Sequence, residues 1–307
     1  MKIFCDFPNG LGSANHVDGH PASAPVRLAN PRAVIAFGSA HGGCGKSALV
    51  ANLAGALALA GIKVGILDAD LNAPSIPGIL GIKPFRMLPA IGGIEPAAGP
   101  LGLRIIAANL IPSGEPPPFS FADNDSMADA PTVAPAPIDL PVDYSTTLTH
   151  IAANARFGNV DLVLVDLATG IDHIHRASRL IALDGVVLVS TPTGAALQAT
   201  RSAAAISGGA PTVGIIENMA GFNCDNCHSV RPLFPLGGAM SSGPALLGRL
   251  PFDPRLAECA ERGTLFVKDY PETPAARLIV ETARRVEAAV NSIVGRYASV
   301  VESIQPK

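Results

Sequence analysis

The chain has 307 residues, of which 48% are hydrophobic and 15% are charged, and its formal net charge is −3. This length suggests one large domain or two modest ones, and the apolar fraction is sufficient for a buried core. A slightly acidic chain lacks the basic surface of a general nucleic-acid binder. The absence of Trp, with only 5% aromatic residues, also argues against single-strand binding by base stacking. We therefore expect no nucleic acid among the partners.

Five cysteines spread over a long chain do not form the framework of a disulfide-stabilised protein. The amino terminus, where Asp6 and Asn9 interrupt the apolar residues, does not resemble a secretory signal. The most apolar stretch, residues 48–67, contains Asn52 and Lys63 and divides into a helix, a turn and a strand rather than a membrane span. We expect a cytoplasmic protein without a membrane partner.

Strands and helices are predicted to alternate after an irregular amino-terminal tail, residues 1–30. Short apolar runs without strict alternation are typical of strands that are buried on both faces. The expected strands are residues 33–37, 63–67, 103–107, 162–165, 186–190 and 213–216. Helices are expected at residues 46–60 and 196–205. This order predicts an α/β fold in which helices cover both faces of a mostly parallel, twisted sheet.

Residues 31–307 are expected to form one domain with two irregular excursions. A Pro-rich insertion is predicted at about 111–142, and a loop at about 219–235 contains a pair of cysteines. A helix is predicted from Pro274 to about Val301, because Thr273 can cap it and Pro274 suits its first position. Apolar residues on one stripe of this helix indicate that it docks on the domain.

A glycine-rich segment follows the first expected strand and leads directly into a helix. Such a segment lets backbone N–H groups converge on a polyphosphate, and the helix amino terminus adds partial positive charge. Its residues are Gly42, Gly43, Cys44, Gly45, Lys46, Ser47 and Ala48. Lys46 would neutralise phosphate oxygens and Ser47 would ligate Mg²⁺. Ala40 stands where the strict P-loop pattern has glycine, so an ordinary strand–helix turn is the alternative.

Carboxylates follow two further strands at their carboxyl ends. Asp68 and Asp70 come at the end of the second strand, and Asp166 ends the fourth. A single Asp in such a place is more often a helix cap or a loop residue. The glycine-rich segment and these two carboxylate sites, however, all lie at the carboxyl ends of expected parallel strands, which meet at one edge of the sheet. Asp166 would help to hold Mg²⁺ there. Together they predict a site for ATP or ADP.

Cys224 and Cys227 form a CxxC pair, which can supply two ligands to one metal. Two thiolates do not complete a tetrahedral site, so either other residues of the chain or a second subunit must add ligands. Four thiolates from two subunits would suit an iron–sulfur cluster, and Zn²⁺ accepts the same ligands. A redox-active pair and two inert thiols are the remaining interpretations.

These motifs together resemble the Mrp/ApbC/Nbp group of P-loop ATPases, which are cytosolic iron–sulfur cluster carriers. The group belongs to the deviant-Walker-A class, which also contains MinD and ParA. The resemblance extends from about Arg32 to the last helix. It is carried by residues 67–77, by residues 216–219 before the cysteine pair and by residues 247–255. The Pro-Ser-Ile-Pro stretch and the Glu-Asn-Met sequence separate this group from MinD and ParA.

The resemblance implies a role for individual residues. Asp70 would position or activate the attacking water, Asp68 would belong to the same switch, and Asn218 would contact adenine. Cys224 and Cys227 would hold a [4Fe–4S] cluster that bridges a homodimer. ATP turnover would then drive transfer of the cluster to recipient apoproteins.

Three features depart from the family pattern. His41 stands where the family has its signature lysine, Ala48 replaces a threonine, and residues 167–171 lack the usual Pro-Pro-Gly-Thr. Losing a transition-state cation costs around 10³–10⁵ in rate in related phosphoryl-transfer systems. Nucleotide binding is therefore better supported than hydrolysis. The leading hypothesis is an ATP-binding cluster carrier. The alternatives are a nucleotide-binding scaffold without turnover, a zinc-bridged dimer, and a positioning ATPase, which the charge and the mixed-sign last helix disfavour.

Overall fold

The computed structural model describes residues 24–29, 31–83, 89–90, 93–110, 144–205, 209–223, 230–234 and 243–304. In this part of the chain the main sheet has the strand order β12-β9-β8-β1-β7-β2-β6-β5, and only β5 runs antiparallel to its neighbour. The strands are β1 (Ala33–Gly38), β2 (Val64–Ala69), β5 (Ala97–Ala98), β6 (Arg104–Ala107), β7 (Leu162–Leu167), β8 (Gly185–Ser190), β9 (Thr212–Glu217) and β12 (Leu246–Arg249). The predicted α/β fold is confirmed.

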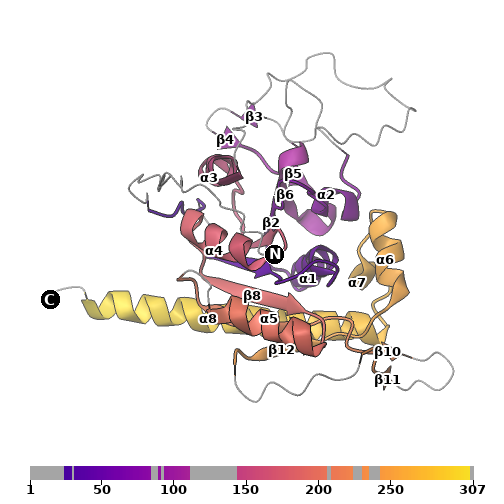
Figure 1. The fold of residues 1–307 in the computed structure, drawn as a ribbon. Helices are drawn as coiled ribbons and strands as arrows, with labels where there is room; N and C mark the ends of the chain where they lie inside the picture. The colour runs from indigo at the N-terminus through magenta and orange to yellow at the C-terminus, as the bar shows by residue number, and fades with distance from the viewer. Residues whose placement is uncertain are drawn as a thin grey trace, which may run out of the picture.

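Helices cover both faces of this sheet, as Figure 1 shows for α5 in front of β8 and α8 behind it. α1, α7 and α8 pack together, and α3, α4 and α5 pack in series. The helices are α1 (Lys46–Leu59), α2 (Ile76–Ile79), α3 (Tyr144–Asn154), α4 (Ile171–Leu180), α5 (Gly194–Ala205), α6 (Pro254–Glu261), α7 (Phe266–Asp269) and α8 (Pro274–Ile304). The hydroxyl of Thr273 accepts the N–H of Ala276 at 3.2 Å, so the predicted cap of the last helix is confirmed.

Every strand expected from the sequence is present, within two residues of its expected ends. All six side chains of β1, β2, β7 and β8 are buried, which explains why these strands read as uniformly apolar runs. The sequence analysis did not predict α3, α4, α6 or β12. α4 and α6 are polar on average, so apolar content gives little sign of them. β12 is a four-residue edge strand with exposed ends.

Two 3₁₀ turns and two short strand pairs complete the described structure. Two 3₁₀ turns flank β6, at Pro100–Gly102 and Ala108–Leu110, and short antiparallel pairs form at β3 (Pro89–Ala90) with β4 (Gly93–Ile94) and at β10 (Phe222–Asn223) with β11 (Val230–Arg231). The Pro-rich insertion predicted at 111–142 lies outside the described residues. Among the described residues, no helix has the length and apolar content needed to cross a membrane.

The described end of the expected tail contacts the domain. The N–H of Val26 donates to the Leu180 carbonyl and the N–H of Ala182 donates to the Val26 carbonyl, both at 2.8 Å. Val26 thereby forms an isolated parallel bridge with Ile181, and Leu28 is buried. Residues 24–29 are therefore held against the end of α4, although they form no regular element.

Candidate nucleotide-binding site

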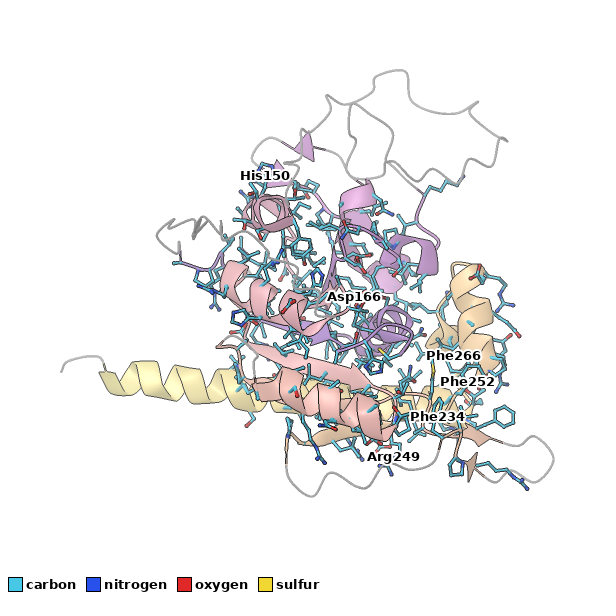
Figure 2. The ribbon with its side chains drawn as sticks, viewed as in Figure 1. His150, Asp166, Phe234, Arg249, Phe252 and Phe266 are labelled. Atoms are coloured by element: carbon cyan, nitrogen blue, oxygen red, sulfur yellow. The ribbon has the colours of Figure 1, made fainter. Side chains whose placement is uncertain are left out.

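The carboxyl ends of β1, β7 and β2 meet at one edge of the sheet, because these strands are parallel neighbours. β1 leads into the glycine-rich loop before α1, β2 contains Asp68 and is followed by Asp70, and β7 contains Asp166. The register of β2 and β7 places Asp68 directly opposite Asp166. Figure 2 shows Asp166 in the interior of the molecule. The three segments predicted to form one site therefore do come together.

The glycine-rich loop has a backbone that side chains would disturb. Gly43 and Gly45 have φ angles of +79° and +74°, in the left-handed region that glycine occupies at little cost. A Cβ at Gly45 would also lie 2.7 Å from Nδ2 of Asn218, so the position is crowded as well as strained. Gly42 and Gly43 are exposed, whereas Cys44 is buried beneath them. The exposed loop at the start of α1 is suited to an anionic ligand.

Lys46 and Asp166 form an ion pair between the Nζ and Oδ1 atoms, and both side chains are buried. The Lys46 ammonium also lies 3.5 Å from the hydroxyl of Ser47. Burial raises the pKa of Asp166, and the nearby charge of Lys46 opposes this rise. An ammonium carries three donors, so Lys46 can also donate to an oxygen of a bound phosphate.

The other oxygen of Asp166, Oδ2, is buried and has no hydrogen-bond partner among the described residues. A buried polar oxygen without a partner costs free energy, so a positive group or a donor is expected beside it. The hydroxyl of Ser47, at the first turn of α1, is half-buried nearby. Carboxylate and hydroxyl oxygens are the hard ligands that Mg²⁺ prefers. Ser47 and Asp166 therefore fit a magnesium ion.

Asp68 and Asp70 differ in their surroundings. Asp68 is fully buried, and its two oxygens accept the N–H groups of Ile76 at 3.0 Å and of Asp70 at 3.2 Å. Burial, together with the neighbouring charge of Asp166, raises the pKa of Asp68 to about 8. Asp70 is half-buried and accepts the N–H of Ala73 at 3.2 Å. Asp68 thus holds the turn in place, while Asp70 has access to solvent.

Asn218 is placed against the glycine-rich loop. Its Nδ2 donates to the carbonyl of Cys44 at 2.8 Å, and its backbone N–H donates to the carbonyl of Ser190 at 2.8 Å. The next residue, Met219, has a φ of +57°, which turns the chain sharply after β9. Asn218 therefore ties the end of β9 to the loop, and the contact with adenine that the resemblance implies stays a prediction.

The segment that follows Asp166 contacts the loop despite its unusual sequence. The N–H of Gly170 donates to the carbonyl of Ser39, the residue after β1, at 2.8 Å. His41, which stands in place of the family lysine, is half-buried in the loop. α4 begins at Ile171, directly after this contact. The start of α4 is therefore tied to the entry of the glycine-rich loop.

Tyr144 is a residue of this site that sequence reasoning missed. It is the first residue of α3, and its hydroxyl donates to the carbonyl of Ala69, between Asp68 and Asp70, at 3.1 Å. A contact between residues 75 positions apart leaves no local sequence pattern. Burial, and next the charge of Asp70, raise the pKa of Tyr144 to about 12, so its hydroxyl remains a donor at neutral pH.

The predicted metal ligands Cys224 and Cys227 lie outside the described residues. The strands that flank them are described: β10 and β11 pair antiparallel, with Asn223 opposite Val230. The end of β9 is fixed by a 2.6 Å ion pair between the buried Glu217 and Arg249 of β12. In the described part of the chain, no three His, Cys, Asp or Glu side chains gather as a metal site.

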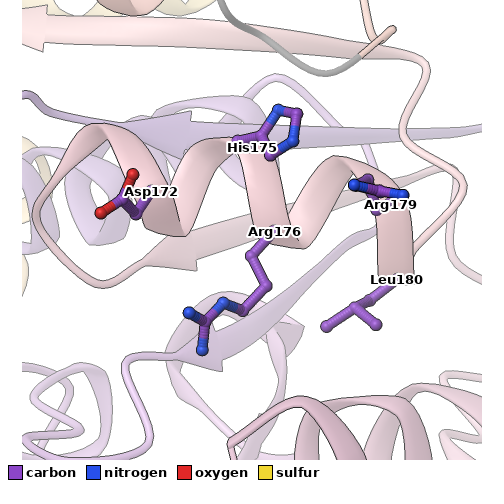
Figure 3. A pocket seen from close by; sticks show the side chains of 5 residues that line it. All are labelled: Asp172, His175, Arg176, Arg179 and Leu180. Carbon is purple, nitrogen blue, oxygen red and sulfur yellow. The ribbon is translucent and has the colours of Figure 1, made fainter. Parts of the chain in front are cut away.

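A hollow of about 330 Å³ lies on α4, and no residue of the glycine-rich loop lines it. Its lining residues are Asp172, His175, Arg176, Arg179 and Leu180. In Figure 3, His175 and Arg176 point to opposite sides of the helix. His175 and Arg176 therefore do not converge on one point in the hollow.

Comparison with known proteins identifies the family. The model of the ParA family, described as NUBPL iron-transfer P-loop NTPases, matches residues 30–118 and 141–287. The chain belongs to this family. An iron-sulfur cluster carrier protein of Aquifex aeolicus is 31% identical over 85% of this chain and 69% of its own length. The human cytosolic Fe-S cluster assembly factor NUBP2 is 30% identical over 86% of this chain and 96% of its own length.

Solved structures agree with the P-loop NTPase fold. A nucleotide-binding protein of Archaeoglobus fulgidus in complex with ADP has a TM-score of 0.62 at 27% identity, over 80% of this chain and 90% of that one. The septum site-determining protein MinD of Pyrococcus horikoshii, complexed with Mg-ADP, has a TM-score of 0.59 at 21% identity, over 85% of this chain and 98% of that one. The predicted resemblance to this class of P-loop proteins is confirmed.

Proposed function

We propose that this chain is an ATP-binding iron–sulfur cluster carrier of the cytoplasm, which acts as a homodimer and delivers its cluster to recipient apoproteins. The observation that carries the proposal is the buried Lys46–Asp166 pair with the unpartnered Asp166 oxygen, at the edge where the glycine-rich loop enters α1. Membership of an iron-transfer family and the names of the curated relatives support the identity of the cargo.

The loop and the start of α1 bind the phosphates of ATP or ADP. The residues that surround the phosphates are Gly42, Gly43, Cys44, Gly45, Lys46, Ser47 and Ala48. Lys46 donates to phosphate oxygens, and Ser47 with Asp166 holds Mg²⁺, which supplies charge neutralisation when it is bound. Asn218, already fixed against the loop, contacts the adenine base.

The turn after β2 performs the remaining part of the chemistry. Asp70, half-buried at the surface of the site, orients the water that attacks the terminal phosphate. Asp68 remains buried and fixes the backbone N–H groups on either side of the turn. The two neighbouring carboxylates thereby have different tasks, set by their different exposure.

The cluster is cargo held by Cys224 and Cys227. A [4Fe–4S] cluster takes four thiolates, and a dimer that places two such loops face to face supplies them. The antiparallel pair of β10 and β11 supports this role, because both cysteines belong to the six residues of sequence, 224–229, between these two paired strands. Zn²⁺ bound by the same cysteines is the alternative to the cluster.

The test of cargo binding is reconstitution of the protein with iron and sulfide under anaerobic conditions. We expect about four iron and four sulfide per dimer and a visible absorption band, both lost with Cys224→Ser. Cys259→Ser is the matched control, because this buried thiol belongs to α6. Zinc without sulfide, or a cluster that survives the Cys224→Ser substitution, would reject the carrier function.

A nucleotide-binding scaffold without turnover is the second candidate, favoured by His41 in place of the family lysine. Imidazole is shorter than a lysine side chain and is largely neutral near pH 7. Single-turnover assays decide between the two candidates: hydrolysis that Asp70→Ala abolishes excludes the scaffold. His41→Lys should raise the rate if this position lacks a needed cation.

A further inference from the structure

Tyr144 contacts two segments beside the proposed nucleotide site, the turn after β2 and α4. Its hydroxyl is 3.1 Å from the carbonyl oxygen of Ala69, and its ring meets the ring of His173 edge-on, with centroids 5.2 Å apart. The guanidinium carbon of Arg176 lies 5.8 Å from the centre of the same ring. One side chain on α3 therefore contacts the turn after β2 and two residues of α4.

The contact at Ala69 reaches the middle of the carboxylate turn. Asp68 and Asp70 flank Ala69. Apart from a hydrogen bond from Nδ2 of Asn109 to the Pro74 carbonyl at 3.4 Å, the other hydrogen bonds that shape the turn are local to residues 68–76. A shift of the Ala69 carbonyl moves the Asp70 backbone directly, because the two share a peptide bond. The tyrosine hydroxyl therefore restrains the Asp70 backbone from outside the turn.

The other contacts of Tyr144 are with α4, the helix whose start is tied to the entry of the glycine-rich loop. α4 begins one residue after Gly170, whose N–H donates to the carbonyl of Ser39 at the entry of the glycine-rich loop. His173 and Arg176 lie one helical turn apart, so both rest on the tyrosine ring. In Figure 3, Arg176 points away from His175, to the opposite side of α4.

Electrostatics agree with this placement. The charge of Asp70 raises the pKa of Tyr144, after the larger effect of burial, and the charge of Arg176 lowers it. Both charges therefore lie close enough to act on one phenol group. Anchoring of α3 does not require this hydroxyl, because Leu148 and Ile151 of the same helix are fully buried in the core.

We propose that Tyr144 is a positioning residue that couples the Asp68–Asp70 turn to α4, so that a change at the phosphates is transmitted to His173 and Arg176. This inference rests on the proposed nucleotide site but not on the cluster. It assigns α3, which follows the insertion, a role in the response to nucleotide. Tyr144 holds Asp70 through the Ala69 carbonyl and takes no part in the chemical step itself.

Tyr144→Phe tests the coupling, because it removes the hydroxyl and keeps the ring. Tyr270→Phe is the matched control: that ring also lies under an arginine, with Arg255 at 5.4 Å, but belongs to the segment after α7. The readout is the NMR signal of the His173 ring, assigned with His173→Gln, when Mg²⁺ and a non-hydrolysable ATP analogue are added. Calorimetry measures the affinity for the same ligand.

We expect Tyr144→Phe to reduce the ligand-induced movement of the His173 signal at least twofold, with the dissociation constant changed by less than about twofold. Tyr270→Phe should leave the movement unchanged, and both variants should melt within about 3 °C of the wild type. Equal movements in the wild type and Tyr144→Phe would overturn the inference, because the ligand would then act on α4 without the hydroxyl.

A second measurement needs no nucleotide, so failure of the proposed function is distinguishable from failure of the coupling. Asp70→Asn removes the charge from the turn and should move the His173 signal in the otherwise wild-type protein. Combined with Tyr144→Phe, the same substitution should move the signal less than half as far. If no nucleotide binds but this non-additivity is found, the nucleotide function is rejected and the coupling stands. Additive movements reject the coupling.

Discussion

Replacing the buried Asp68 by asparagine should change how the stability of the protein depends on pH. Burial beside Asp166 raises the pKa of Asp68 in the folded protein to about 8, from an ordinary value of 3.8. Between these two values the folded protein holds a proton that the unfolded chain releases. The contribution of Asp68 to stability is therefore fully present below the unfolded pKa, and it is lost as the pH rises through 8.

The magnitude follows from this linkage. Because the folded protein binds one proton more than the unfolded chain, its free energy of unfolding falls by about 1.4 kcal/mol for each unit of rising pH below the folded pKa. The fall is about 2 kcal/mol between pH 6 and pH 8. At about 2.1 cal/mol/K per residue for unfolding, this loss corresponds to about 3 °C in Tm for a chain of 307 residues. Titrating groups that do not interact with Asp68 contribute equally to both proteins and cancel in the comparison, so the difference between the two curves reports the Asp68–Asp166 pair.

Asp68→Asn removes this pH dependence at a fixed cost. Asparagine has one acceptor oxygen for the two N–H groups, of Ile76 and Asp70, that Asp68 binds, so we expect a loss of about 1–2 kcal/mol at pH 6. Because the wild type loses about 2 kcal/mol by pH 8, the two stability curves should converge there.

The assay is thermal or urea unfolding of both proteins at intervals from pH 6 to pH 8. Asp161→Asn is the matched control, because Asp161 also accepts a backbone N–H, that of Lys63 at 2.9 Å, but at the surface. Its curve should run parallel to that of the wild type. If the Asp68→Asn and wild-type curves also run parallel, Asp68 is ionised in the folded protein and the assignment of the proton is wrong.

Two further substitutions test the geometry of the loop and of the buried pair. Gly45→Ala should lower the affinity for ADP at least tenfold in calorimetry, because its Cβ would lie 2.7 Å from Asn218, whereas Gly43→Ala meets no atom within 4 Å and should cost less; equal losses would reject the crowding argument. Lys46→Met should lower the free energy of urea unfolding by about 3–5 kcal/mol, and by less as the pH is lowered, because burial raises the pKa of Asp166 and a proton can then replace the lost cation. No loss at any pH would show that the pair is not buried.

The sequence predicted the parts of the fold that depend on local pattern. β1, β2, β7 and β8 are largely apolar runs because both faces of the sheet are covered, and a run of this kind has few other interpretations. The glycine-rich loop and the carboxylates were found because each follows a strand at its carboxyl end. Cys224 and Cys227 lie outside the described residues, so their role as ligands stays a prediction.

The contacts that set the chemistry were not predictable in the same way. The Lys46–Asp166 pair joins residues 120 positions apart, and the hydrogen bond from Asn218 to Cys44 spans 174 positions. α4 has polar residues over most of its length, since it covers the sheet with few side chains such as Ile174 and Ala177. Its close contact with Tyr144 depends on the packing of α3 against α4, which no local pattern encodes.

Two buried carboxyl groups lie side by side in this site, which is electrostatically unfavourable, and packing of the surrounding sheet offsets the cost. The β2–β7 register that pairs Asp68 with Asp166 places two buried carboxyl groups side by side, an arrangement that disfavours ionisation of both. Lys46 compensates for one charge, and a proton compensates for the other. The same register also pairs apolar residues, such as Ile66 with Leu164, along the strands before the site. Burial of these pairs offsets the cost of the carboxylates. Neutral substitutions at Asp68 therefore cost the fold little at high pH.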